Sequence, residues 1–137
     1  MNPSRLTSSV LPAPDGEAAV LAVDDEPALR GLLFSLLARR GFDVLTAASV
    51  EEALEVARSR RLSLVISDYG LGPRNGLDLL AELRAEQPRV PFVLASVAFP
   101  ADVVAEAERA GADLVIDKAA LVDDLVRTTD RAVGRAA

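Results

Sequence analysis

The sequence predicts a doubly wound α/β fold, in which five parallel strands in the order 2-1-3-4-5 carry helices on both faces. Three observations predict it. Short apolar runs rich in branched residues alternate with segments of helical periodicity. Most of these runs contain few polar residues, which is typical of strands buried on both faces. Acids or other polar residues follow most of the runs, at the sheet edge where this architecture binds ligands.

The five strands are expected where apolar runs of four to seven residues are bounded by turn or charged residues. They lie at Val20–Val23, Phe42–Ala47, Leu62–Asp68, Val90–Ser96 and Leu114–Asp117. The run Leu62–Asp68 is almost entirely apolar until its last residue, so we expect it at the centre of the sheet.

The helices between the strands are indicated by their first turns and by leucine spacing. Pro27 fits the first turn of a helix, where its missing N–H costs nothing, and this helix should end before Gly41. Ser49 followed by Glu52 has the pattern of a capping box. The expected helices run from Pro27 to about Arg40, Val50 to about Arg60, about Leu77 to Leu83, Pro100 to Ala110, and Ala120 to Val133.

The chain length of 137 residues suits one domain with a genuine core. Residues 1–17 are rich in Pro, Ser, Asp and Gly, so we expect a flexible N-terminal tail followed by a domain over 18–137. The longest uncharged run, Val90–Ala101, is shorter than the ~20 residues that cross a bilayer. A soluble, cytoplasmic protein with no membrane partner is the expectation.

Composition excludes several kinds of chemistry. The net charge of −6 argues against a nucleic-acid partner, because phosphate neutralisation needs a basic face. The chain has no cysteine and no histidine, so thiolate and imidazole ligands, nucleophiles and bases are all excluded. Any chemistry must therefore use carboxylates, hydroxyls, lysine or the backbone.

Five polar residues lie at the carboxyl ends of the expected strands. Asp24 and Asp25 follow the first strand, Asp68 ends the third, Ser96 ends the fourth, and Lys118 follows the fifth. Oxygen ligands without nitrogen or sulfur suit Mg²⁺, which would explain why the acids crowd together. A carboxylate can also attack phosphorus and form an aspartyl phosphate.

Taken singly, these residues have simpler explanations. Asp24 or Asp25 could be a helix N-cap, and Asp68 could open a turn. Ser96 could bond only to its local backbone, and Lys118 could be a solvated surface lysine. The functional interpretation gains its weight from all of them falling at one edge.

Four segments together resemble the response-regulator receiver domain of bacterial two-component signalling, whose fold is flavodoxin-like. They read VLAVDDEPALRGLL, LVISDYGLGPRNGLDLL, PFVLAS and AGADLVIDK. The resemblance covers about Val20 to Val133, with the motifs in order and at matching spacings. It implies that Asp68 is the phosphoacceptor. It also implies a Mg²⁺ site formed by Asp24, Asp25, Asp68 and the backbone carbonyl of Gly70, with Asp25 the more direct ligand of the acid pair.

The resemblance further implies that Ser96 supplies a switch hydroxyl and that Lys118 pairs with the phosphoryl group. Several positions depart from the family pattern, Gly72 and Val97 among them. Val115 stands where the family often has the aromatic residue that moves with the hydroxyl, and Ala119 replaces the proline that commonly follows the lysine. These departures bear on the output of the domain and leave the phosphorylation residues intact.

By this resemblance we expect a single-domain response regulator rather than an enzyme, catalysing only its own phosphorylation and dephosphorylation. The implied partners are a histidine kinase or phosphotransfer protein and a downstream protein. The surface of the fourth helix, fifth strand and fifth helix would bind that downstream target or a second copy of the chain. Two alternatives remain: a degenerate receiver that binds a partner without phosphorylation, and a phosphatase with an aspartate nucleophile. The phosphatase is disfavoured because its Asp-x-Asp arrangement is missing after the first strand.

Overall fold

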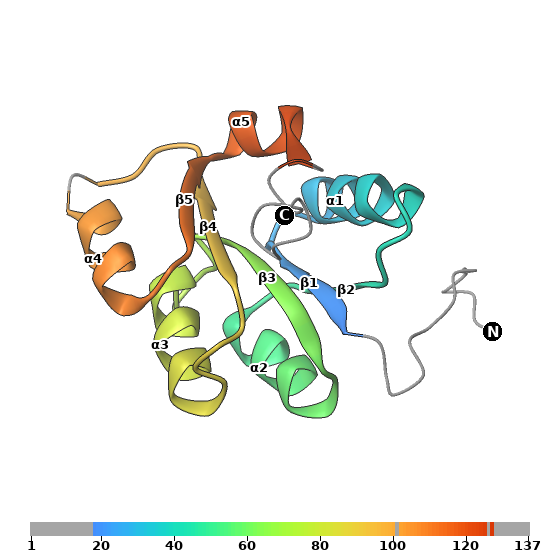
Figure 1. The fold of residues 1–137 in the computed structure, drawn as a ribbon. Helices are drawn as coiled ribbons and strands as arrows, with labels where there is room; N and C mark the ends of the chain where they lie inside the picture. Colours follow the sequence, from blue (N-terminus) through green and yellow to red (C-terminus); the bar gives the residue numbers. More distant parts are fainter. Residues whose placement is uncertain (1–17, 101, 126, 128–137) are drawn as a thin grey trace.

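In the computed structural model, which describes residues 18–100, 102–125 and 127, five parallel strands form one sheet in the order β2-β1-β3-β4-β5. The predicted fold and strand order are therefore confirmed (Figure 1). The strands are β1 (Ala19–Val23), β2 (Val44–Ala47), β3 (Leu62–Asp68), β4 (Phe92–Ser96) and β5 (Leu114–Asp117).

Helices cover both faces of the sheet (Figure 1). They are α1 (Pro27–Arg39), α2 (Val50–Ser59), α3 (Gly76–Glu86), α4 (Val103–Ala110) and α5 (Lys118–Asp123). One core cluster joins the sheet to α2, α3 and α4, and the other joins it to α1 and α5. Alternate residues of β1 enter opposite clusters, as a strand with two buried faces requires: Leu21 belongs to the first and Ala22 to the second.

Two strands begin later than predicted, each for a local reason. The predicted start at Phe42 was wrong, because its amide donates to the Leu37 carbonyl at 3.2 Å, within the turn that ends α1. The predicted start at Val90 was also wrong, because Pro91 has no N–H to place in a ladder and pairing begins at Phe92.

Two helices also begin at other residues than predicted. Pro100 lies before α4, where its carbonyl accepts the Val103 amide at 3.0 Å in a turn. Helix α5 begins at Lys118 rather than Ala120, because the Asp117 side chain accepts from the Ala119 and Ala120 amides at 2.8 and 3.3 Å. The last helix was predicted to continue to Val133, but α5 ends at Asp123 with Asp124 as its C-cap. Residues 126 and 128–133 of that prediction, and the predicted tail over 1–17, lie outside the described residues.

The Ser49 cap at the start of α2 is confirmed, with a difference in its second bond. The Ser49 hydroxyl accepts from the Glu52 amide at 3.1 Å, while the Glu52 carboxylate accepts from the Ala48 amide at 2.7 Å instead of the Ser49 amide. Within the described part of the chain, no helix is both long and apolar enough to cross a bilayer.

Candidate functional site

The chain reverses its direction of winding beside β1, since β2 lies on one side of this strand and β3 on the other. Val23 of β1 pairs with Ser67 of β3. An aspartate follows each residue of this pair, Asp24 directly after β1 and Asp68 as the last residue of β3. The two aspartates therefore lie side by side at the carboxyl edge of the sheet. This is the switch point at which such sheets form ligand sites.

The structure brings the three predicted carboxylates together. Asp24, Asp25 and Asp68 each offer an oxygen atom, and these atoms lie within 4.8 Å of one another. Asp24 is 1% exposed, Asp68 is half-buried and Asp25 is exposed, so the cluster reaches from the protein interior to solvent. A set of oxygen donors at this spacing, open on one side, fits the ligand preference of Mg²⁺, which keeps several waters.

Lys118 is not a solvated surface lysine. Its side chain is 14% exposed, and its Nζ lies 3.0 Å from Asp24 Oδ2 and 3.3 Å from Asp68 Oδ1. The end of β5 and the Asp117 cap place Lys118 at the first residue of α5. One cation therefore bridges two of the three carboxylates.

These contacts shift two pKa values in the same direction. Burial raises the pKa of Asp68, and the charges of Asp24 and Asp25 raise it further, while Lys118 opposes the shift without cancelling it. For Lys118, burial lowers the pKa, but the hydrogen bond to Asp24 and the charge of Asp68 outweigh burial, so the pKa lies above its ordinary value. The lysine thus stays charged, while the ionised form of Asp68 lowers the stability of the folded protein relative to the protonated form.

Asp24 is fixed by three contacts, and none makes it the N-cap of α1. The N-cap is Glu26, whose side chain makes no capping bond. Asp24 Oδ1 accepts from the Glu26 amide at 2.9 Å, Oδ2 pairs with Lys118, and the backbone carbonyl accepts from Arg30 Nη1 at 2.7 Å. Arg30 is a residue that the sequence reasoning missed, although an arginine in the opening turns of a helix directly after an acid pair is visible in the sequence.

Ser96 ends β4 one residue beyond Ala95, the residue that pairs with Asp68. Its hydroxyl donates to the Ala98 carbonyl at 3.0 Å and accepts from the Ala98 amide at 3.3 Å. In this structure the hydroxyl is engaged locally, as its simpler explanation expects. Its movement toward a phosphoryl group stays a prediction, as does the metal contact of the Gly70 carbonyl.

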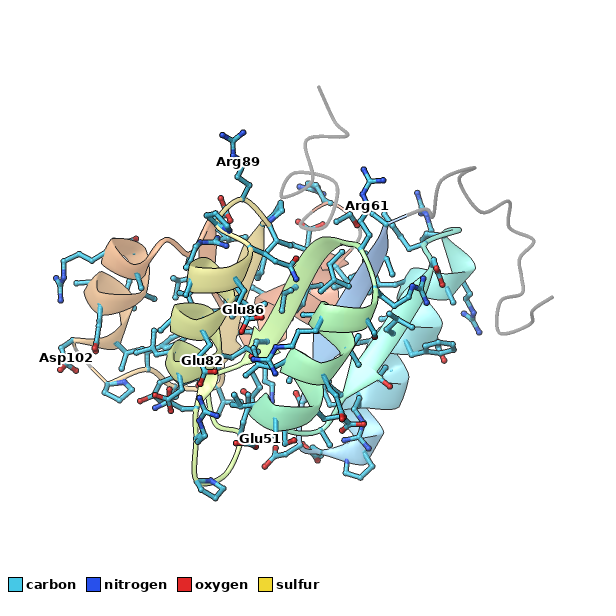
Figure 2. All side chains as sticks on the ribbon, turned by 90° about the horizontal axis from the view of Figure 1, so that it is seen from below. Glu51, Arg61, Glu82, Glu86, Arg89 and Asp102 are labelled. Atoms are coloured by element: carbon cyan, nitrogen blue, oxygen red, sulfur yellow. The ribbon has the colours of Figure 1, made fainter. Side chains whose placement is uncertain are left out.

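The loop after Asp68 is anchored by contacts that the sequence reasoning did not identify. Asn75 caps α3, and Asp78 returns a bond to the Asn75 amide, which completes a capping box. Arg74 forms ion pairs with Glu51 of α2 and Glu82 of α3; Figure 2 labels the two glutamates. The pattern Asn-x-x-Asp was visible in the sequence and could have predicted the cap.

Gly76 marks a close approach between α3 and the end of β3. A Cβ atom there would lie 2.6 Å from the Asp68 carbonyl oxygen and 2.6 Å from Leu94 Cδ1. The Gly76 amide also donates to the Tyr69 carbonyl at 2.7 Å. Glycine at this position lets α3 pack directly beneath the phosphoacceptor candidate.

An aromatic contact joins the two loops beside the site. The rings of Tyr69 and Phe99 have centroids 6.2 Å apart and planes inclined by 57°. Val115, at the position where the resembling family often has an aromatic residue, packs against the core cluster beneath α2, α3 and α4. The aromatic side chains near this site therefore come from the loops after β3 and β4.

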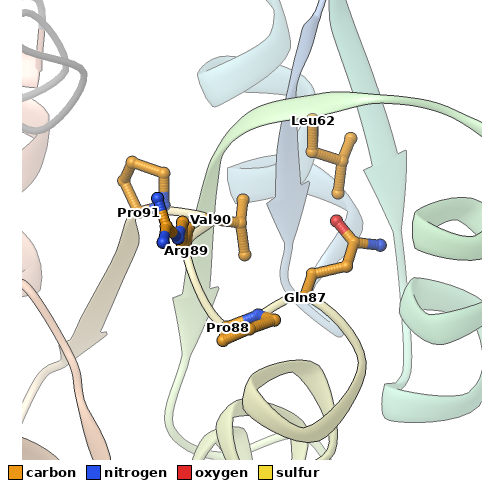
Figure 3. Close-up of a pocket in the computed structure, with 6 residues that line it drawn as sticks. All are labelled: Leu62, Gln87, Pro88, Arg89, Val90 and Pro91. Atoms are coloured by element: carbon orange, nitrogen blue, oxygen red, sulfur yellow. The ribbon is translucent and has the colours of Figure 1, made fainter.

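A separate shallow hollow lies at the opposite edge of the sheet, where β3 and β4 begin (Figure 3). Its lining contains no residue of the carboxylate cluster. The residues that line it are Leu62, Gln87, Pro88, Arg89, Val90 and Pro91.

Comparison with known proteins agrees with the resemblance seen in the sequence. The model of the response regulator receiver domain matches residues 20–130. A nitrogen assimilation regulatory protein NtrX of Azorhizobium caulinodans is 36% identical over 116 residues, which are 83% of this chain and 26% of that protein. The chain spans less than two thirds of the length of the curated relatives compared.

Solved structures give the same picture. The receiver domain of NtrX from Brucella abortus superposes with a TM-score of 0.77 at 32% identity, covering 84% of this chain and 98% of that one. A CheY-like receiver domain protein from Methanospirillum hungatei gives a TM-score of 0.81 at 23% identity, covering 86% of this chain and 94% of that one. The second likeness shows the shared fold.

Proposed function

The chain belongs to the response regulator receiver domain family, and from that premise we propose that it accepts a phosphoryl group on Asp68 and thereby switches a protein-binding surface. The observation that carries this proposal is the cluster itself, in which three carboxylates lie within 4.8 Å and Lys118 bridges two of them. Membership of this family disfavours the phosphatase alternative. The partners that the family implies are a histidine kinase or phosphotransfer protein and a downstream protein target.

The proposed reaction assigns a separate task to each residue. An Asp68 carboxylate oxygen attacks phosphorus, a P–O bond forms, and the bond from phosphorus to the donor breaks, so that the donor leaves with the electron pair. Lys118, already beside Asp68, neutralises part of the charge that the phosphoryl oxygens bring. We propose that Ser96 then leaves Ala98 and donates to the phosphoryl group.

Asp24, Asp25, Asp68 and the Gly70 carbonyl would hold Mg²⁺. The bound ion would offset the charge of the attacking carboxylate and of the incoming phosphoryl group. Asp24 would hold the ion in place during transfer, because its carboxylate is fixed by the Glu26 amide and by Lys118. The protein would catalyse only its own phosphorylation and dephosphorylation.

Output would follow from the β4–α4 loop and from the junction of β5 and α5, where Lys118 directly follows Asp117. Phosphorylation adds negative charge and strong acceptors, which can draw Ser96 and Lys118 toward the new group. We propose that the resulting movement changes the surface of α4, β5 and α5, where a downstream protein or a second copy of the chain binds. A cytoplasmic location stays a prediction.

The test is phosphorylation by acetyl phosphate with Mg²⁺, followed by intact-protein mass spectrometry. We expect one phosphoryl group that survives mild acid and is lost in base, as an acyl phosphate should be. Asp68→Asn should take up none. Asp43→Asn, which changes an aspartate at the opposite sheet edge, should be labelled like the wild type.

Two outcomes would contradict the proposal in different ways. A folded wild type that takes up no phosphoryl group would favour a degenerate receiver that binds partners without phosphorylation, an alternative that Val115 and Ala119 support. An Asp68→Asn protein labelled as well as wild type would show that another residue is the acceptor.

A further inference from the structure

We propose that Arg30 is a positioning residue for the metal site, holding the peptide between Asp24 and Asp25 in the orientation that lets both acids face a divalent cation; this rests on the proposed function. The contact that carries the inference is the 2.7 Å hydrogen bond from Arg30 Nη1 to the Asp24 carbonyl oxygen. No role in phosphoryl transfer is assigned to Arg30 itself.

The carbonyl that Arg30 contacts can orient both acidic residues. It belongs to the peptide that joins Asp24 to Asp25, and a peptide unit is planar and rigid. Fixing the direction of this one carbonyl therefore fixes the plane from whose two ends both acidic residues project. A guanidinium is suited to this because its donors form a rigid planar fork.

The two acids need this support to different extents. The Asp24 side chain has its own partners, the Glu26 amide at 2.9 Å and Lys118 at 3.0 Å. The exposed Asp25 side chain has no hydrogen bond or ion pair to any residue that the structure describes. Its place in the cluster is set by the backbone of the β1–α1 loop, and Arg30 is the side chain that bonds this backbone from within α1.

The position of Arg30 in the helix supports a local purpose. It is the fourth residue of α1, and its amide already donates to the Glu26 carbonyl at 3.0 Å. A cation near a helix N-terminus works against the helix dipole, so helix stability does not favour arginine here. The half-buried guanidinium turns back over the start of the helix to the acid pair instead.

Positioning and simple repulsion predict opposite signs for the removal of Arg30. If its positive charge only opposed Mg²⁺, then Arg30→Met would tighten Mg²⁺ binding. If Arg30 orients the acids, the same variant would weaken binding despite the loss of a nearby cation. The sign of the change therefore separates the two effects.

The experiment is calorimetric titration of purified protein with MgCl₂, without any phosphodonor. We expect the dissociation constant of Arg30→Met to rise roughly tenfold, the scale of change seen when a residue that orients a metal ligand is lost. Arg30→Lys keeps the charge and one donor group, so it should recover part of the affinity. Arg39→Met removes an exposed arginine from the last turn of the same helix and should bind Mg²⁺ like wild type.

Melting curves in chelator accompany each titration, so that a folding defect is seen separately from a binding defect. Wild-type affinity or tighter binding in Arg30→Met would overturn the inference and leave the proposed function standing. If Arg30→Met does not fold, Arg30→Leu takes its place, because it also removes the guanidinium donor, and wild-type affinity in this folded variant would overturn the inference equally. A wild type that binds no Mg²⁺ would overturn both proposals.

Discussion

The two edges of the same sheet treat charge in opposite ways. At the amino edge Arg60 pairs with Asp43 at 2.8 Å, and Arg84 donates to the carbonyls of Val90 and Gly111, both at 2.7 Å. At the carboxyl edge three carboxylates lie close together, and the one cation Lys118 bridges only two of them. Figure 2 shows Arg61 and Arg89 at one end of the sheet and Glu51 toward the other.

The difference indicates that the carboxyl edge is less stable than it could be, because its charges are arranged for binding rather than for folding. A partly exposed pair such as Arg60–Asp43 contributes little to stability, but it places opposite charges in contact. The carboxyl edge keeps like charges close together, and the pKa of Asp68 is raised first by burial and then by the charges of Asp24 and Asp25. A ligand that relieves this repulsion gains binding free energy from it, so the strained edge is the one suited to bind a cation.

The largest expected effect comes from disturbing the packing beneath the carboxyl edge. Gly76→Ala should destabilise the protein by up to about 3 kcal/mol, because its Cβ would press against the Asp68 carbonyl and the buried Leu94 side chain. Gly31→Ala is the matched control, since no atom lies within 4 Å of the added Cβ and alanine favours a helix. Urea unfolding measures both; equal effects would contradict the close approach.

The next effect concerns the charge of the cluster. Mg²⁺ at a hundredfold excess over its dissociation constant should stabilise wild type by about 2.7 kcal/mol, because it binds the folded cluster and not the dispersed acids. Asp68→Asn should melt higher than wild type in chelator and gain less from Mg²⁺, because it removes a charge that burial already disfavours. Paired melting curves at constant ionic strength measure this.

The difference in stability between Asp68→Asn and wild type in chelator should depend on pH in one direction. Folding raises the pKa of the Asp68 carboxyl, so its ionisation costs stability above the folded-state pKa and costs nothing below the pKa of the unfolded chain. The advantage of Asp68→Asn in chelator should therefore shrink as the pH falls through this interval. An advantage that grows toward acid pH, or identical Mg²⁺ shifts for both proteins, would be incompatible with the three-carboxylate site.

The smallest effect is expected at the amino edge. Arg60→Ala should cost about 0.2–1 kcal/mol, because the Arg60–Asp43 pair is partly exposed and screened by water. The loss should diminish in high salt, and Mg²⁺ should stabilise the variant as much as wild type. A loss comparable to that of Gly76→Ala would mean that the two edges are not as different as their contacts indicate.

Sequence reasoning predicted the sheet order and the joining of Asp24, Asp25, Asp68 and Lys118, because apolar strand length and polar strand ends are local signals. In a parallel α/β topology the carboxyl ends of neighbouring strands meet at one edge, so residues far apart in the sequence become neighbours in space. The strands Leu62–Asp68 and Leu114–Asp117 were predicted with their observed bounds for the same reason.

What the sequence did not reveal depends on tertiary contacts. Arg30 could have faced solvent from α1, and only the turn of the β1–α1 loop brings the Asp24 carbonyl within its reach. The bonds of Ser96 to Ala98 likewise depend on how the chain turns after β4. Helix and strand ends shifted wherever a cap or a proline outweighed hydrophobic periodicity, as at Asp117 and Pro91.

The contact between Tyr69 and Phe99 also has an optical consequence. The chain contains one tyrosine and no tryptophan, so its tyrosine fluorescence arises from a single residue, Tyr69, which follows Asp68 in the sequence and contacts Phe99 in the loop after Ser96. Movement of that loop would change the surroundings of the Tyr69 ring. The protein thus carries a built-in spectroscopic reporter, which can follow events at Asp68 in real time without an attached dye.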